Sequence, residues 1–259
     1  MADLRENIKT EVSDFAPQAA ASQESPIAVQ SEEAPAALVP SAAQQHRANI
    51  PTKEEMRAAF IERHGEEIQQ RFAAASVAVC GLGGLGSNIA IALARAGVGH
   101  LHLIDFDRVD ISNLNRQQYE ASQIGQYKTE ALAGNLRKIA PYINITTDTV
   151  RITAENAAEL LQGEEIICEA FDLAEAKAML VNHVLENMSD RYLVSGSGMA
   201  GIDSANLIKT RKLMDRFYLC GDGVSDVGDG LGLFSARVLV CAAHQATMIL
   251  RIIAGMTEA

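Results

Sequence analysis

The stretch VAVCGLGGLGSNIAIALARAGVGHLHLID, residues 77–105, decides the fold. It begins with a short apolar run (77–80), continues through a segment with helical spacing that closes on a glycine (87–97), and ends in an alternating run (100–105). Between the first run and the helical segment, Gly81, Gly83 and Gly86 have the GxGxxG spacing. A strand, a glycine turn, a helix and a second strand in this order are typical of the βαβ unit of a Rossmann-like fold.

The glycine turn indicates a phosphate site. Glycines allow a tight turn and close backbone approach, and the start of a helix presents free N–H groups and the positive end of its dipole. Asp105 follows Gly86 by nineteen residues and is placed to accept hydrogen bonds from ribose hydroxyls. The alternative is that the glycines only permit tight packing of the helix on the strand. We favour a nucleotide because motif, context and acid coincide, although the spacing does not say which nucleotide.

The alternation of strand and helix continues along the chain. Further helices are predicted over 128–140, 154–163, 173–189 and 235–255, and further strands over 143–152, 165–172, 192–196 and 205–211. Such repeats predict an α/β fold, with a doubly wound, mostly parallel sheet covered by helices on both faces. Ligands are then expected at the carboxyl ends of the strands.

Composition excludes several classes of protein. The chain has 259 residues, 48% of them hydrophobic and 21% charged, and a net charge of −11, which is typical of one substantial core and argues against a nucleic-acid partner. Charged residues interrupt the apolar stretches before the roughly 20 residues of a membrane helix are reached. The first residues, MADLRENIKTEV, lack the pattern of a secretory signal. We therefore expect a cytoplasmic protein that does not associate with membranes.

The four cysteines are widely separated, without any CxxC pair, so neither a structural zinc site nor a disulfide framework is expected. Residues 1–50 are rich in Ala, Gln, Ser and Glu, and residues 1–48 hold four of the six prolines and no glycine, which predicts a disordered or weakly helical tail. The globular domain is expected over 51–259. It begins with one or two helices, for which Thr52 is a candidate N-cap.

The segment after the ribose acid is unusual for a nicotinamide enzyme. DFDRVDISNLNRQ, residues 105–117, supplies Asn113 and Arg116, and Lys128 follows. Two cations near one nucleotide suggest more phosphate charge than a dinucleotide carries, because Arg grips phosphate oxygens with a planar fork and Lys adds a compact charge. The alternative is that both are solvated surface charges.

Three motifs, GLGGLGSN, DFDRVDISNLNRQ and IGQYK, resemble the adenylating domain of the E1-like superfamily. Within it, ERHGEE, YLCGDGVSD and GLGLFSARVLVCAAHQA resemble the short, zinc-free ThiF branch, and the likeness covers roughly residues 55–254. The resemblance implies an ATP- and Mg²⁺-dependent adenylyltransferase, without zinc. Its expected partner is a ubiquitin-like sulfur carrier (ThiS) ending in Gly-Gly, which it activates for synthesis of the thiamine thiazole.

The resemblance also implies roles for individual residues. The phosphate loop is formed by Gly81, Gly83, Gly84 and Gly86, and Asp105 holds the ribose. Asn113, Arg116 and Lys128 match positions that contact the nucleotide and its phosphates. Asp172 matches a metal-associated aspartate; the alternative is that it only caps the next helix.

Two further site residues rest on the resemblance. Arg63 lies where dimeric relatives send an arginine into the partner's active site, so a homodimer is expected; the alternative is an exposed helix charge. Cys220, in LCGDGVSD, is the candidate nucleophile of a second step, because glycines and acids suggest an exposed flexible loop. The neighbouring acids Asp222 and Asp226 would raise the pKa of its thiol, which argues against strong activation.

Several functions stay open on sequence grounds. The acceptor can be a molybdopterin-type sulfur carrier or a tRNA, the latter disfavoured by the negative net charge. From other classes, a nicotinamide-dependent oxidoreductase and a non-catalytic nucleotide-sensing scaffold both fit the glycine motif.

Overall fold

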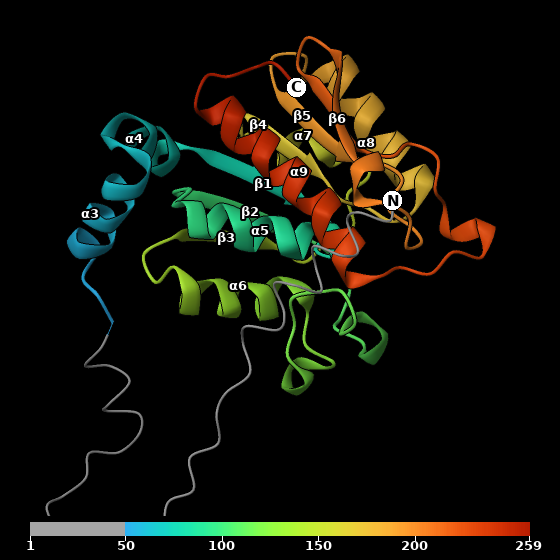
Figure 1. The fold of residues 1–259 in the computed structure, drawn as a ribbon, viewed down its shortest axis with the longest axis horizontal. Helices are drawn as coiled ribbons and strands as arrows, with labels where there is room; N and C mark the ends of the chain where they lie inside the picture. The colour runs from blue at the N-terminus through green and yellow to red at the C-terminus, as the bar shows by residue number, and fades with distance from the viewer. Residues whose placement is uncertain (1–49) are drawn as a thin grey trace, which may run out of the picture. The chain divides into compact units, whose positions relative to one another are not determined.

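A computed structural model describes residues 50–259. Its centre is a seven-stranded sheet in the order β3-β2-β1-β4-β5-β7-β6 (Figure 1). All neighbouring strands pair in parallel except β6, which runs antiparallel to β7 at one edge. The strands are β1 (Ser76–Cys80), β2 (His100–Ile104), β3 (Asn144–Asp148), β4 (Ile166–Glu169), β5 (Tyr192–Gly196), β6 (Lys209–Met214) and β7 (Phe217–Gly221).

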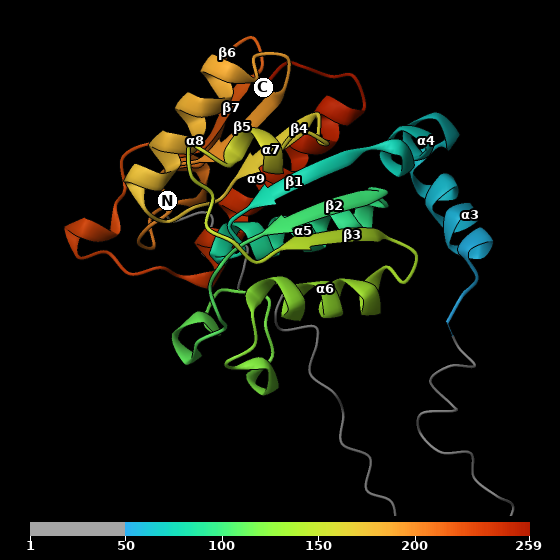
Figure 2. The same ribbon diagram turned by 180° about the vertical axis from the view of Figure 1, so that it is seen from behind.

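Helices cover both faces of the sheet, as the sequence predicts. One face carries α5 (Gly84–Ala96), α6 (Lys128–Ile139) and α9 (Ser235–Ile253), and the other carries α7 (Ala157–Leu160) and α8 (Ala174–Asn187), seen from the two sides in Figures 1 and 2. Two separate clusters of buried apolar side chains fill these layers. The doubly wound, mostly parallel α/β fold is therefore confirmed.

The local signals of the sequence explain how these elements begin and end. Strand β1, SVAVC, is almost fully buried because helices cover both of its faces. Before it, α3 (Lys53–His64) and α4 (Glu66–Ala74) form the predicted helical pair, and Thr52 caps α3 in a capping box with Glu55. Gly97 ends α5 in the left-handed conformation, φ 84°, which glycine adopts without a steric penalty.

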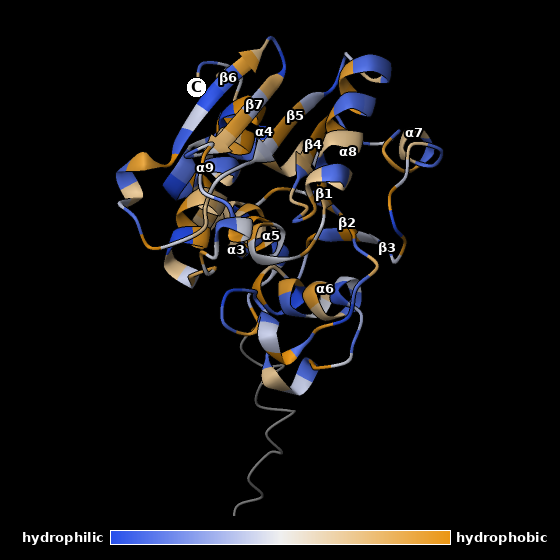
Figure 3. Cartoon of the chain, turned by 90° about the vertical axis from the view of Figure 1, so that its right-hand side faces the viewer, coloured by the Kyte–Doolittle hydropathy of each residue, from blue (hydrophilic) through white to orange (hydrophobic). Residues whose placement is uncertain are grey.

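The structure differs from the sequence prediction around the antiparallel edge. Residues 217–221 form β7, which inserts between β5 and β6, whereas the sequence pattern placed a loop from residue 219. The strand was missed because it is short and directly precedes a glycine-rich segment. Edge strand β6, KTRKLM, starts with four polar residues and is mostly blue in Figure 3.

Helix α9 is long and apolar enough to cross a membrane by length and composition. In this structure half of its apolar window is buried, and it packs against α5 and the sheet, as expected for the core helix of a globular domain. The predicted tail, residues 1–50, lies outside the described residues except for Ile50.

Candidate active site

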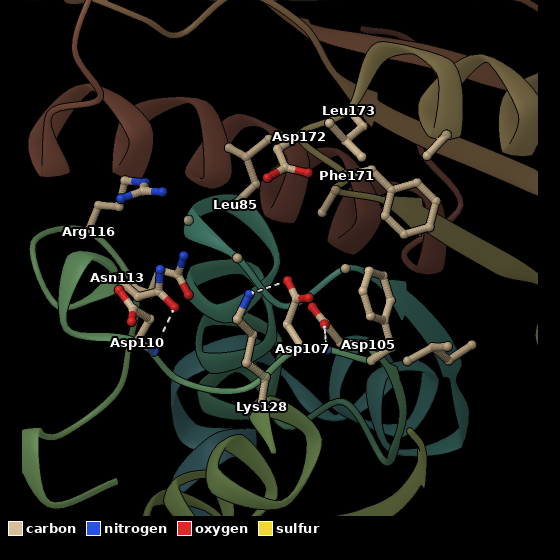
Figure 4. A pocket seen from close by; sticks show the side chains of 18 of the residues that line it. Leu85, Asp105, Asp107, Asp110, Asn113, Arg116, Lys128, Phe171, Asp172 and Leu173 are labelled. Atoms are coloured by element: carbon tan, nitrogen blue, oxygen red, sulfur yellow. Dashed lines mark hydrogen bonds and ion pairs between the residues drawn. The ribbon is translucent and has the colours of Figure 1, made fainter. Parts of the chain in front are cut away.

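A pocket of about 410 Å³ lies at the carboxyl ends of β1, β2 and β4. The strands are parallel, so the loops that follow them open at the same edge of the sheet. Figure 4 shows that Arg116, Lys128 and Asp172, from three different segments, surround this space. This is the edge at which ligands of doubly wound sheets bind.

The four glycines of the first turn have different structural roles. Gly81, Gly83 and Gly84 line the pocket, as predicted. A Cβ on Gly83 would meet only Gln117 Nε2, at 3.8 Å, so this position leaves open space beside the start of α5. Gly86 is not among the lining residues; a Cβ there would overlap Gly81 O, so its missing side chain serves the packing of α5 on the turn.

The peptide groups of Leu82 are fixed from two sides. Its N–H donates to Asp105 Oδ2 at 2.6 Å, and its carbonyl accepts from the Tyr119 hydroxyl at 2.8 Å. Both partners are buried. The glycine turn is therefore held rigidly, and Tyr119 is a supporting residue that sequence analysis did not identify.

Asp105 is 8% exposed and lines the pocket. Besides Leu82, the backbone N–H of Asp107 donates to its carboxylate, at 2.7 Å. Burial raises the pKa of the Asp105 carboxyl, while the charge of Lys128 and the two backbone hydrogen bonds oppose that rise. A carboxylate oxygen has two lone pairs, so Asp105 retains acceptor sites for a ribose.

Lys128 is 6% exposed and begins α6. Its Nζ forms an ion pair with Asp107 Oδ2 at 2.9 Å, drawn as a dashed line in Figure 4. Lys128 thus lines the pocket with a carboxylate partner that the sequence did not indicate, and its contact with a nucleotide stays a prediction. A bound phosphate would compete with Asp107 for the ammonium group.

Segment 110–117 supplies a second side of the pocket. Asn113 ends a short 3₁₀ helix, Ile111–Asn113, and its Oδ1 accepts from Asp110 N at 3.0 Å. Arg116 is half-buried, and its Nη1 donates to Ser112 O and Asn115 Oδ1. Gln117, which sequence analysis did not single out, also lines the pocket, and its buried Oε1 has no hydrogen-bond partner within the described residues.

Asp172 follows β4 and lines the pocket with an exposed side chain. Helix α8 begins after Leu173, and no side chain caps it. Asp172 therefore does not act as the cap of this helix. Within the part of the chain that the structure describes, Asp172 takes part in no side-chain hydrogen bond or ion pair. Its carboxylate is available to a ligand.

The turn before Asp172 depends on a buried charge that the sequence did not reveal. Glu169 is fully buried, pairs with Lys177 Nζ at 2.6 Å and accepts from Phe171 N at 2.7 Å and from Ser195 Oγ. Because Glu169 binds the backbone of Phe171, the ion pair fixes the direction in which the chain presents Asp172.

The prediction that Cys220 lies in an exposed flexible loop is wrong. Cys220 belongs to β7, where its side chain is fully buried, with Sγ 3.5 Å from Thr210 Oγ1. Burial raises the pKa of the thiol to about 11. A neutral, inaccessible thiol is a poor nucleophile. The structure therefore contradicts the exposed, flexible loop on which the predicted role of Cys220 as a nucleophile depended.

Arg63 lies in the last turn of α3 and is absent from the pocket lining. Helices α3 and α4 precede β1, at the amino ends of the strands (Figure 1). The pocket opens at the opposite edge, so Arg63 belongs to a separate region of its own chain. Its predicted role in a partner's site stays a prediction.

The pocket combines charge balance with apolar surface. It is lined by four acidic and four basic side chains, among them Arg151, whose guanidinium lies 4.0 Å from the ring centroid of Phe106. Phe171 adds a second aromatic ring. Within residues 50–259, no group of three or more His, Cys, Asp or Glu side chains is arranged to hold a metal by itself. Aromatic and apolar walls beside mixed charges suit a ligand with a flat base and phosphates.

Fold and site together define a Rossmann-like α/β protein with the architecture of an E1-like adenylation domain. The chain belongs to the ThiF family, whose sequence model matches residues 55–259. The resemblance drawn from the glycine turn and the segment that follows Asp105 is therefore confirmed.

Two curated relatives illustrate the range of this family. The chain is 35% identical over 137 residues to the tRNA threonylcarbamoyladenosine dehydratase of Escherichia coli, a match covering 52% of this chain and 51% of the relative. It is 33% identical over 153 residues to the sulfur carrier protein adenylyltransferase of Thermus thermophilus, covering 57% and 51%. The chain thus spans about half the length of the curated relatives it matches.

Solved structures show the same fold. A crystal structure of the E. coli dehydratase in complex with AMP superposes with a TM-score of 0.70 at 24% identity, covering 80% of this chain and 97% of the other. E. coli MccB with ATP gives a TM-score of 0.57 at 19% identity, covering 83% and 75%. At these identities the likeness establishes the architecture alone.

Proposed function

We propose that this chain is an ATP-dependent adenylyltransferase that activates the C-terminal glycine carboxylate of a ubiquitin-like sulfur carrier. The observation that carries the proposal is the convergence of the glycine turn, Arg116, Lys128 and Asp172 on one pocket. A helix N-terminus and two cations can bind the phosphates of a triphosphate, and the free carboxylate can bind the metal ion that accompanies them.

The proposed reaction needs positioning and charge neutralisation more than proton transfer. An oxygen of the acceptor carboxylate attacks the α-phosphorus, the bond to the β-phosphate oxygen breaks, and pyrophosphate leaves. No general base is required, because a C-terminal carboxylate is already ionised at neutral pH. We assign to Arg116 and Lys128, which both line the pocket, the neutralisation of the charge that develops on the departing oxygens.

The donor set fits Mg²⁺, although Asp172 is the only acid in the pocket that we assign to it. Protein-bound Mg²⁺ is typically held by one or two carboxylates together with phosphates and water. Asp172 is exposed and offers both oxygens. When bound, the ion supplies further charge neutralisation on the phosphates.

A ThiS-type carrier ending in Gly-Gly, acting in thiazole synthesis in the cytoplasm, is our first choice of acceptor. The T. thermophilus relative, named as a sulfur carrier protein adenylyltransferase, supports this class of acceptor. We further propose a homodimer in which Arg63 of each chain completes the site of the other. The separation of Arg63 from the pocket of its own chain is compatible with that arrangement.

A tRNA acceptor is the second candidate, favoured by the similarity to the E. coli tRNA dehydratase. The net charge of −11 opposes it, because binding a nucleic acid depends on neutralising phosphates with Lys and Arg. A molybdopterin-type carrier is a third acceptor, of the same chemistry as ThiS.

The test is exchange of labelled pyrophosphate into ATP. The purified chain is assayed with a ThiS-type carrier, a MoaD-type carrier, each carrier lacking its Gly-Gly end, and a tRNA. We expect exchange only with an intact carrier, and its loss in the Asp172→Asn variant. No exchange with any carrier would refute the proposal.

Two further readouts separate the other classes. A nicotinamide enzyme binds NADH and changes its fluorescence, whereas we expect ATP with Mg²⁺, and not NADH, to raise the melting temperature. A nucleotide-sensing scaffold would gain the same stability from ATP without catalysing exchange.

A further inference from the structure

Two loops leave the carboxyl edge of the sheet next to one another: residues 197–208 after β5 and residues 222–234 after β7. They start together because β5 and β7 pair in parallel, Gly196 opposite Cys220. Met199 and Leu233 from these loops line the pocket together with Val238 of α9. This wall contains none of the residues that hold the glycine turn.

Arg237 joins the two loops. It lies in the first turn of α9 and is 5% exposed. On the first loop its Nε donates to Ala200 O at 3.1 Å, and its Nη1 donates to Asp203 O at 2.5 Å and to Ser204 O at 2.9 Å. On the second loop its Nη2 pairs with Asp222 Oδ2 at 2.6 Å. The planar fork of arginine can serve all four oxygens at once.

Asp222 is the matching anchor on the second loop. Its side chain is 5% exposed and accepts from Val224 N, Ser225 N and Ser225 Oγ as well as from Arg237. Burial acts to raise the pKa of this carboxyl, but these hydrogen bonds outweigh it and lower the pKa to about 2. The carboxylate of Asp222 therefore stays ionised at neutral pH. The Arg237–Asp222 pair is here called the clasp.

Backbone packing brings the loops closer than side chains would allow. Asp222 N donates to Gly198 O at 2.9 Å, and Gly223 N donates to Ser197 O at 3.1 Å. Gly198 has φ +80°, and a Cβ there would overlap Asp222 Oδ1 and lie 2.5 Å from Gly223 N. The approach of the two loops thus depends on glycine as well as on the clasp.

We propose that Arg237 and Asp222 are positioning residues, which hold the two loops as the wall along which the acceptor carboxylate reaches the nucleotide. This inference rests on the proposed function. In the described chain the clasp shares no hydrogen bond with Asp105, Lys128 or the glycine turn, and we therefore assign it to the acceptor side rather than to the nucleotide. Asn115 Nδ2 donates to Leu233 O at 3.2 Å and ties the wall to segment 110–117.

The test compares Arg237→Met and Arg237→Lys with a control, Arg251→Met, on the same helix. Within residues 50–259, Arg251 donates only to the backbone oxygen of Glu258. The readouts are the Kd for ATP, the hydrogen exchange of both loops, and the KM for a ThiS-type carrier in pyrophosphate exchange.

For Arg237→Met we expect faster hydrogen exchange in both loops and at least a tenfold higher carrier KM, with the ATP Kd unchanged within twofold. Arg237→Lys should be intermediate, because an ammonium group reaches Asp222 but does not bridge the carbonyls. Gly198→Ala should open the same loops, because its Cβ would displace Asp222 and the backbone of Gly223 although both clasp residues are retained. Arg251→Met should match the wild type.

The inference is overturned if Arg237→Met leaves loop exchange and carrier KM unchanged, or if ATP affinity and carrier KM worsen together, as a merely structural role predicts. If the wild type shows no pyrophosphate exchange at all, the proposed adenylyltransferase function is refuted, and the role of the clasp in guiding the acceptor is overturned too. Hydrogen exchange then still decides whether the clasp holds the loops.

Discussion

Alanine substitutions should show that Gly86 and Gly83 have different roles. Gly86 allows α5 to pack on the glycine turn, whereas Gly83 leaves space for a ligand beside the start of α5. A Cβ at Gly86 would overlap Gly81 O and lie 2.9 Å from Gly81 C and 3.2 Å from Val79 Cγ1. The obstacle is backbone, which cannot turn aside as a flexible side chain can. Gly86→Ala therefore has to displace the turn that forms the pocket floor.

The cost follows from the size of this overlap. Overpacking typically costs about 1–3 kcal/mol, and a backbone clash belongs at the top of that range. Alanine regains about 1 kcal/mol of helix propensity relative to glycine, which offsets part of it. We expect a net loss of about 2 kcal/mol, and for a domain of this size that lowers the melting temperature by roughly 4–8 °C.

Gly83→Ala should behave in the opposite way. A Cβ there meets nothing closer than 3.8 Å, so the melting temperature should stay within about 2 °C of wild type, less than about 1 kcal/mol of change. The added methyl group occupies the space through which a phosphate approaches the backbone, so the Kd for ATP should rise at least tenfold, or about 1.4 kcal/mol.

The assays are thermal unfolding and calorimetric titration with ATP and Mg²⁺, run on both variants. Equal loss of stability in the two variants would refute the assignment of separate roles. So would a Gly83→Ala variant that binds ATP as the wild type does.

Three other predictions concern single side chains. Asp172→Asn should lower pyrophosphate exchange at least a hundredfold with an unchanged melting temperature, because Asp172 is exposed; a matching fall in melting temperature would contradict a purely catalytic role. His102 lies between Asp148 at 2.7 Å and Glu164 at 3.2 Å, and although burial acts to lower its pKa, these hydrogen bonds raise the pKa above 6.5. Its stabilisation is therefore complete below pH 6.5 and is lost as the pH rises through the folded-state pKa; thermal unfolding against pH should show this slope, and His102→Gln should remove it. The Cys220 thiol should react with a thiol reagent only after unfolding, and rapid labelling of the native chain, located by peptide mapping, would contradict its burial.

Much of the fold was predictable because its signals are local. Apolar runs, helical spacing and the glycines of residues 77–105 identified the first βαβ unit. Thr52 caps α3, as expected from the sequence. The spacing of Asp105 from the glycine turn placed it at the end of β2. Asp172 was predicted to end a strand over 165–172, whereas the observed β4 ends at Glu169 and Asp172 follows it. In a parallel sheet the carboxyl ends of the strands lie at one edge, so the topology places Asp105 and Asp172 at the same edge.

The sequence by itself determined the order of the elements apart from β7, the glycine turn and the residue types that reach the pocket. Only the tertiary structure decided which charges are already paired, as Lys128 is with Asp107, and that Cys220 is buried inside a strand. It also revealed the clasp, in which Arg237 binds the carbonyl of Ala200, 37 residues away in the chain. The physical reason is that burial and long-range hydrogen bonds depend on which surfaces meet after folding, whereas periodicity and capping depend on neighbours in the sequence.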